Sequence, residues 1–125
     1  MFVRMDFLKK KAKYFEEEAR EAYEKNRFTL VLFFVEQSIQ LYLKYLIYKR
    51  IGDYPKTYNL KVLFENLNRL IDISEFITEN EEIIDLLTTS YIESRYTMME
   101  YGKKSAELSL RFLDKFKEKF KNEID

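Results

Sequence analysis

The chain contains no cysteine, no histidine and no tryptophan, and only two glycines and one proline occur among its 125 residues. Without cysteine it has no disulfide framework, and without cysteine and histidine it builds neither a zinc site nor a histidine general base. So few turn-forming residues also leave little room for a sheet of many strands. The composition therefore predicts an all-α protein, and a metal site made only of carboxylates is the one metal option left.

The chain also has no net charge, because 22 lysines and arginines balance 22 aspartates and glutamates. No net field therefore attracts nucleic acid or another polyanion. The lysines within residues 9–13 and 115–121 would form a basic stripe for RNA if the terminal helices packed side by side. Acidic neighbours at residues 16–18 and 118 neutralise both runs, so two solvated helix faces are favoured over that stripe.

Long hydrophobic runs are missing as well. The longest apolar stretch, residues 28–35, ends at Glu36 and is far shorter than the roughly 20 residues of a membrane span. The first residues include Arg4 and Asp6 and show no apolar leader or cleavage site. We therefore expect a soluble, cytoplasmic protein with no membrane partner.

Apolar residues recur at helical spacing along most of the chain. The segment from about residue 4 to residue 24 is amphipathic, whereas residues 27–49 are apolar nearly all round. The second pattern indicates a helix that is central in a bundle or shared with a partner. Gly52 and Pro55 then predict a connector over residues 50–58.

The second half of the chain predicts three more helices. Asn59 or Thr57 caps a short one, and the Thr78–Glu81 pair has the spacing of a capping box that starts a longer one. A last helix follows Gly102. We expect a single domain, residues 1–125, built as an antiparallel up-and-down bundle of four main helices plus a short additional helix.

Polar side chains interrupt the apolar second helix. Gln37, Gln40 and Lys44 lie along one stripe, with Glu36 beside them. Buried polar groups must be paired. The stripe therefore forms either a wet groove or an internal network.

An arginine lies among tyrosines on the C-terminal half of the predicted fourth helix, in the segment Tyr91–Tyr101. Arg95 is either an ordinary salt-bridged helix arginine or a group that binds a phosphate beside a stacked base. The tyrosines suit a dimer surface equally well, because each has an apolar ring and a polar end. Most of these tyrosines are expected in the core or at an interface. Those considered for stacking a base or covering such a surface are Tyr42, Tyr45, Tyr48, Tyr54, Tyr58, Tyr91 and Tyr96.

Three segments together resemble the HEPN domain family. Residues 33–47 are similar to its second-helix motif of an aromatic residue, a glutamine and a Leu-Lys pair. Residues 52–60 are similar to its Gly…Pro-x-Thr-His-x-Leu connector, with Tyr58 in place of the histidine. Residues 91–96 match its Tyr-x-x-x-Arg-Tyr motif, which is typical of an Arg-Tyr subgroup.

The resemblance implies a four- or five-helix bundle that is usually dimeric and is commonly encoded beside a minimal nucleotidyltransferase, in toxin–antitoxin-like pairs. Many members of the family are metal-independent endoribonucleases with an Arg-x4-6-His motif. Arg95 matches the arginine, but Glu100, Tyr101 and Gly102 occupy the positions of the histidine. Tyrosine, whose reference pKa is about 10, exchanges protons poorly at neutral pH.

We therefore expect a non-catalytic homodimeric module that binds a nucleotide or a protein partner, the partner being a minimal nucleotidyltransferase. Two alternatives stay open: an endoribonuclease acting on RNA through Arg95, Glu100 and Tyr101, and a purely structural dimerisation domain. No cofactor or metal is expected. The expected ligand-binding residues are Arg95, Tyr96, Tyr91, Gln37, Lys44 and Tyr58.

Overall fold

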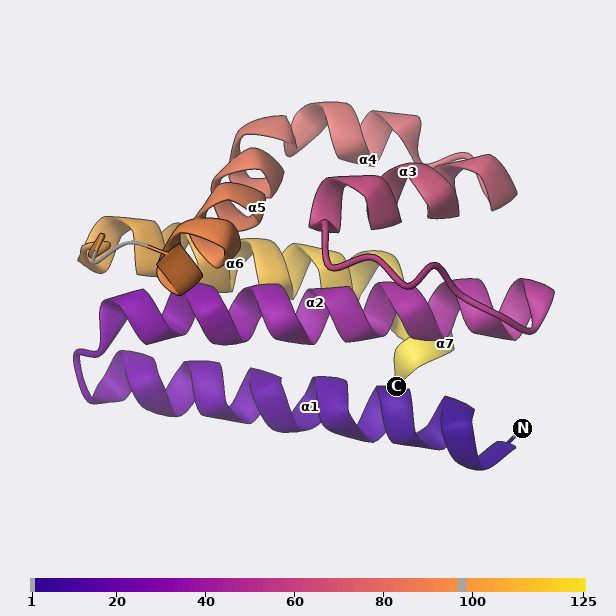
Figure 1. The fold of residues 1–125 in the computed structure, drawn as a ribbon, viewed down its shortest axis with the longest axis horizontal. Coiled ribbons are helices and arrows are strands. Elements are labelled where there is room, and N and C mark those ends of the chain that lie inside the picture. The colour runs from indigo at the N-terminus through magenta and orange to yellow at the C-terminus, as the bar shows by residue number, and fades with distance from the viewer. Residues whose placement is uncertain (1, 97–98) are drawn as a thin grey trace.

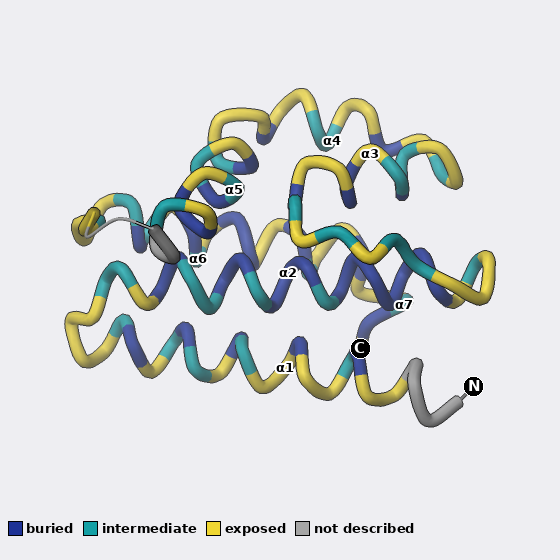
Figure 2. The backbone as a smooth tube through the Cα atoms, viewed as in Figure 1, coloured by how far each residue is buried: buried dark blue, intermediate teal, exposed yellow. Residues whose placement is uncertain are grey.

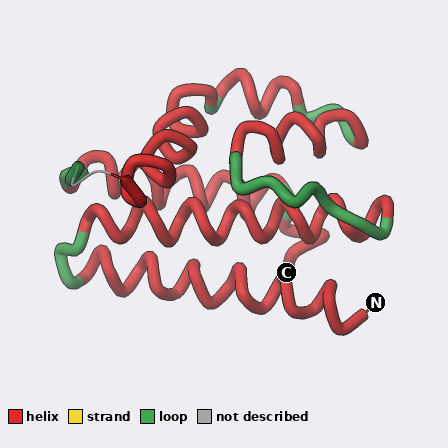
Figure 3. Tube along the Cα trace, viewed as in Figure 1, coloured by secondary structure: helices red, strands yellow, loops and turns green. Residues whose placement is uncertain are grey.

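The computed structural model describes the backbone of residues 2–96 and 99–125 and the side chains of residues 6–93 and 99–125. The described residues form helices joined by loops, with no strand among them (Figure 3). The helices are α1 (Phe2–Glu24), α2 (Phe28–Ile51), α3 (Leu60–Leu70), α4 (Ser74–Glu79), α5 (Glu81–Tyr96), α6 (Lys103–Lys119) and α7 (Lys121–Ile124). The predicted all-α class is confirmed.

The four longest helices alternate in direction along the chain. In Figure 1, α1 runs towards the left and α2 returns to the right, and then α5 runs obliquely back to the left and α6 returns to the right. The shorter α3 and α4 lie on the side of α2 opposite α1. This is the helical bundle that the sequence predicts, with α4 and α7 as two additional short helices.

Helix α2 forms the centre of the bundle. It packs against α1, α3, α5, α6 and α7, and most of its length is buried in Figure 2. It is long and apolar enough to cross a membrane by length and composition, but 72% of its apolar window is buried inside the bundle. Its apolar character on all sides is thus explained by neighbours within the chain.

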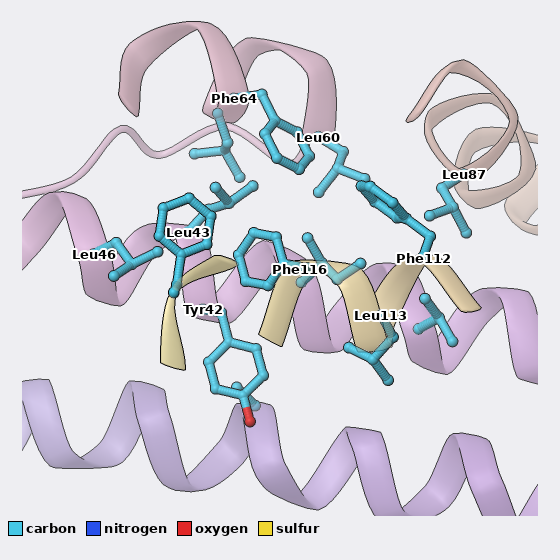
Figure 4. Close-up of a cluster of buried hydrophobic side chains, with 14 of the residues drawn as sticks. Tyr42, Leu43, Leu46, Leu60, Phe64, Leu87, Phe112, Leu113 and Phe116 are labelled. Atoms are coloured by element: carbon cyan, nitrogen blue, oxygen red, sulfur yellow. The ribbon is translucent and has the colours of Figure 1, made fainter. Parts of the chain in front are cut away.

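Aromatic rings fill the space between α2 and the helices on its far side from α1 (Figure 4). The ring of Phe64 on α3 lies with its centroid 6.1 Å from that of Phe112 and 6.0 Å from that of Phe116, both on α6. All three side chains are buried. This cluster fixes α3 and α6 over the middle of α2, which places the connector between α2 and α3 along the surface of α2.

The ends of α2 and α3 agree with the turn chemistry of the sequence. Gly52 has φ 76° and donates its N–H to the Tyr48 carbonyl at 2.7 Å, as expected for a left-handed helix cap. Of the two capping residues considered for α3, Asn59 is the cap, and its Oδ1 accepts from the Val62 N–H at 3.1 Å. The connector begins slightly later than predicted, because α2 continues to Ile51.

The predicted capping box at Thr78 is wrong. Thr78 lies inside the short helix α4, and α5 begins after Asn80 instead. The Asn80 carbonyl accepts from the Ile84 N–H at 3.0 Å, and its side-chain Nδ2 donates back to the Phe76 carbonyl at 2.8 Å. A six-residue helix therefore occupies the segment that the sequence pattern left between the third and fourth helices.

Candidate functional site

The polar stripe on α2 is a buried hydrogen-bond network. The Glu36 carboxylate is fully buried and accepts from Gln37 Nε2 at 2.9 Å and from Gln40 Nε2 at 3.0 Å. Gln40 Nε2 also lies 3.3 Å from the Tyr58 carbonyl in the connector, and Gln40 Oε1 accepts from Lys44 Nζ at 3.3 Å. Of the two alternatives that the sequence leaves open, the structure shows the internal network.

Among the described side chains, none forms an ion pair with the Glu36 carboxylate. Burial raises its pKa from the reference value of 4.5 to about 8, because the charged form loses its water. The hydrogen bonds from Gln40 and Gln37 and the nearby charge of Lys44 oppose this shift without cancelling it. Glu36 therefore changes charge close to physiological pH.

Lys44 lies beneath the connector. Its Nζ is 5.1 Å from the centroid of the Tyr58 ring and 5.6 Å from that of Tyr54, distances typical of cation–π contacts. Burial lowers the pKa of Lys44, the charge of Glu36 acts in the opposite direction, and Lys56 lowers it further. Tyr58 itself is 63% exposed. Lys44 thus supports an exposed tyrosine from below and does not itself face solvent.

The tyrosines near the C-terminal end of α5 pack against the first turns of α2. The Tyr91 ring stacks on Phe33, with a centroid distance of 6.1 Å and an interplanar angle of 21°. The Tyr101 N–H donates to Thr29 Oγ1 at 2.9 Å, and its hydroxyl donates to Glu93 Oε2 at 2.8 Å. Tyr101 thus anchors the segment before α6 to both α2 and α5.

The hydroxyl of Tyr101 is held in its neutral form. Burial is the main cause that raises its pKa to about 12, and the hydrogen bond to Glu93 and the charge of that carboxylate add to the effect. Glu100, the other candidate for the missing histidine, is exposed to solvent. The Tyr101 hydroxyl is therefore poorly suited to accept a proton at neutral pH.

The central residues of the predicted site lie outside the described side chains. Arg95 and Tyr96 belong to the last turn of α5, and nothing beyond this backbone position is described for either. Gln40 joins Lys44 to the Tyr58 carbonyl, and Glu36 joins Gln37 to Gln40. Tyr91 and Tyr101 lie together at the start of α2, where Phe33 is one helical turn before Gln37.

Three of the seven tyrosines considered for stacking or dimerisation lie in the core. Tyr42, Tyr45 and Tyr48 are buried within the bundle. The Tyr42 hydroxyl points towards α1 in Figure 4 and donates to Glu16 Oε1 at 3.2 Å. For these three residues the structure shows the core position, one of the two that were expected for most of these tyrosines.

Sequence reasoning missed a second buried carboxylate. Glu16 is 8% exposed and accepts from Lys117 Nζ at 2.8 Å and Arg20 at 3.1 Å, in addition to Tyr42. It was assigned to a solvated charged face, which is wrong. Glu16 lies four residues after Ala12 and three before Ala19, and this spacing on the apolar face was the signal that could have located it.

Three of the lysines considered for a basic stripe on the terminal helices have acidic or carbonyl partners. Lys117 pairs with Glu16, Lys121 pairs with Glu118 at 3.2 Å, and Lys9 Nζ lies 3.4 Å from the Asp125 carbonyl. Among the side chains that the structure describes, no three acidic groups are clustered closely enough to hold a metal ion. The main electrostatic feature near the predicted site is therefore the network on α2.

Comparison with known proteins gives one match. No curated protein and no solved structure matches the chain. The HEPN domain family matches residues 5–124, which is nearly the whole sequence and includes both the α2 network and the end of α5. The chain therefore belongs to the HEPN domain family.

Proposed function

We propose that this HEPN domain is a non-catalytic module that binds a nucleotide or a protein partner as a homodimer. Arg95 and Tyr96 would grip a phosphate or a partner carboxylate from the last turn of α5. Tyr91, stacked on Phe33, would hold that turn against α2. Gln37 and Lys44 would act from beneath, through the network that positions Tyr58.

One observation carries the non-catalytic part of the proposal. A position that the family's ribonuclease motif gives to histidine holds Tyr101, whose backbone and hydroxyl are both used in structural hydrogen bonds. Its pKa is raised to about 12, so it does not accept a proton at neutral pH. An arginine of the family motif with tyrosine in place of the histidine supports binding without cleavage.

Exposed apolar side chains at the same end of the bundle support the homodimer. Leu30 is 41% exposed and follows Thr29, which accepts from Tyr101. Met99 is 50% exposed two residues before Tyr101, and Ile92 is 49% exposed next to Tyr91. Apolar side chains gathered around a polar site favour association. The family resemblance adds a minimal nucleotidyltransferase as the proposed partner, within the cytoplasm.

Isothermal titration of ATP, AMP and GTP into the purified protein tests the ligand. Wild type should release heat with at least one nucleotide, and Arg95→Ala should abolish it. Arg69→Ala removes an exposed arginine from the last turn of α3 and serves as the matched control. Absence of heat with every nucleotide would remove the nucleotide and leave only the protein partner.

Incubation with single-stranded and structured RNA tests the enzyme alternative. We expect both RNAs to stay intact over hours, whereas cleavage that Arg95→Ala abolishes would establish the endoribonuclease. Sedimentation tests the dimer: Ile92→Asp should shift the protein towards monomer, and Leu70→Asp, at a similarly exposed position on α3, should not. Equal sedimentation of Ile92→Asp and wild type would contradict the dimer at this end.

A further inference from the structure

A groove lies at the other end of α5 from Arg95. It has a volume of about 810 Å³, it runs between α6 and the junction of α4 with α5, and a second hollow of about 550 Å³ adjoins it. Both are lined by Glu79, Asn80, Arg111 and Lys115. Arg95 lies nine residues after Leu86, the last α5 residue that lines the groove, or about 14 Å along the helix at about 1.5 Å per residue. The groove is therefore separate from the site discussed above.

The two walls of the groove carry opposite charges. Glu79, Glu81 and Glu82 lie at the α4–α5 junction, and Arg111 and Lys115 lie one helical turn apart on α6. Other acidic side chains along these hollows are engaged elsewhere, since Asp85 pairs with Lys61, Asp114 with Arg20 and Glu118 with Lys121. Among the described residues no ion pair joins the two walls. Five exposed charges therefore face the groove unpaired.

The floor between these walls is apolar. Ile83 and Leu86 come from α5 and are partly buried, and Leu108, on α6, is 37% exposed above the buried Phe112. A small anion would meet three carboxylates here, and a small cation would meet arginine and lysine. An occupant that complements both walls needs an apolar stripe with basic groups on one flank and acidic groups on the other.

We propose that this groove docks an amphipathic helix of a partner protein, with an apolar stripe, one basic flank and one acidic flank. The basic flank would face Glu79, Glu81 and Glu82, and the acidic flank would face Arg111 and Lys115. The wall of α6 is about 10 Å long in the groove, from Leu108 to Lys115, and the second hollow extends it to Lys119, about 16 Å in all, which accommodates about three helical turns. Helix-in-groove binding of this kind uses apolar anchors for affinity and flanking charges for selectivity.

Three synthetic helical peptides that share the same leucine stripe test the proposal. One has a lysine flank and a glutamate flank, one has lysine on both flanks, and one has glutamate on both flanks. Fluorescence anisotropy should show the mixed peptide binding wild type about tenfold more tightly than either of the others, since each of those opposes one wall. Equal binding of the three, or no binding, would overturn the proposal.

A charge reversal on the protein makes the test specific. The double variant R111E/K115E makes both walls acidic and should now prefer the peptide with lysine on both flanks. The residues are exposed, so the fold is expected to survive. K103E/K104E gives the same change in net charge at exposed positions of α6 outside the groove and should keep the preference of wild type.

Two other results with these variants would overturn the proposal. If K103E/K104E switched the preference as R111E/K115E does, the peptides would be sensing net charge and not the groove. If R111E/K115E instead abolished self-association in sedimentation, the groove would belong to a second copy of this chain.

Discussion

Two glutamates are buried in this bundle, and their carboxylates are held in different ways. Glu16 accepts from two cations, Lys117 and Arg20, and from the Tyr42 hydroxyl. Among the described residues, Glu36 accepts only from the amides of Gln37 and Gln40. The first arrangement joins α1, α2 and α6, whereas the second stays within α2 and reaches the connector through Gln40. The ion-paired site is thus structural, and the amide-held site lies beside the proposed ligand surface.

The two surroundings differ in the partners that they offer to a buried carboxylate. Among the described side chains Glu36 gains only amide donors in place of water, so burial penalises its charged form. This is why the pKa of Glu36 rises to about 8. A network that changes charge near neutral pH can alter how firmly Gln40 and Lys44 hold Tyr58.

The largest expected effect is the pH dependence contributed by Glu36. Its pKa is raised from 4.5 in the reference state to about 8 in the fold, so the folded state binds more protons than the unfolded state between these values. The contribution of Glu36 to the free energy of unfolding is therefore fully present below about pH 4.5. It is lost as the pH rises through about 8, at up to about 1.4 kcal/mol per pH unit. Urea unfolding of wild type and Glu36→Gln between pH 5 and pH 9 measures it.

The difference between the two proteins should change steadily in favour of Glu36→Gln as the pH rises. Glu17→Gln, which removes one carboxylate from the exposed surface of α1, controls for net charge. If wild type and Glu36→Gln gave parallel profiles over the whole range, the amide-held carboxylate would not be the source of the pH dependence.

Glu16→Gln should destabilise the protein by about 1–3 kcal/mol at pH 7, since the partly buried Lys117 would lose its charged partner and Arg20 would keep only Asp114. Urea unfolding at constant pH measures the change. Glu18→Gln, two residues after Glu16 on α1, should stay within about 0.5 kcal/mol of wild type. A Glu16→Gln protein as stable as wild type would contradict the structural role of this site.

Lys44→Met should cost about 1 kcal/mol, because methionine keeps the apolar stem but loses the hydrogen bond to Gln40 and the contacts with Tyr54 and Tyr58. Hydrogen exchange should become faster in the connector, residues 52–59, and not in α1. Lys56→Met removes a lysine that contacts Tyr54 from the exposed side and should have a smaller effect. Unchanged exchange in the connector would show that Lys44 does not support it.

The smallest effect is expected from Tyr101→Phe, which removes one hydrogen bond to Glu93 and keeps the ring and the backbone bond to Thr29. We expect a loss of about 0.5–1.5 kcal/mol of unfolding free energy and unchanged nucleotide binding. A loss of nucleotide binding at unchanged stability would place the Tyr101 hydroxyl in the ligand site.

Much of the fold followed from the sequence because helical spacing and turn residues agree. The apolar second helix, the glycine that ends it and the Asn59 cap are local features, and each is found where predicted within about two residues. The capping box predicted at Thr78 is wrong because the Thr–Glu spacing is a local pattern and does not reveal how the segment packs. The packing of Phe76 against Phe64 and Phe112, with ring centroids 6.4 and 5.9 Å apart, holds a short helix over that position.

The candidate site was predictable in part for a similar reason. Residues 36, 37, 40 and 44 stand out on an apolar helix, so their shared stripe was visible, but only the position of the connector decided between a groove and a buried network. Glu16 was hidden among the neighbouring acidic residues 17 and 18, and its partners come from α2 and α6. Contacts between distant helices cannot be obtained from the spacing along one of them.

The most direct test of the account is calorimetric titration of nucleotides into wild type and Arg95→Ala, with RNA integrity followed on the same samples. We predict heat of binding in wild type, loss of that heat in Arg95→Ala, its retention in Arg69→Ala, and intact RNA throughout. RNA cleavage that depends on Arg95 would contradict the central claim that this HEPN domain binds its ligand without cutting it.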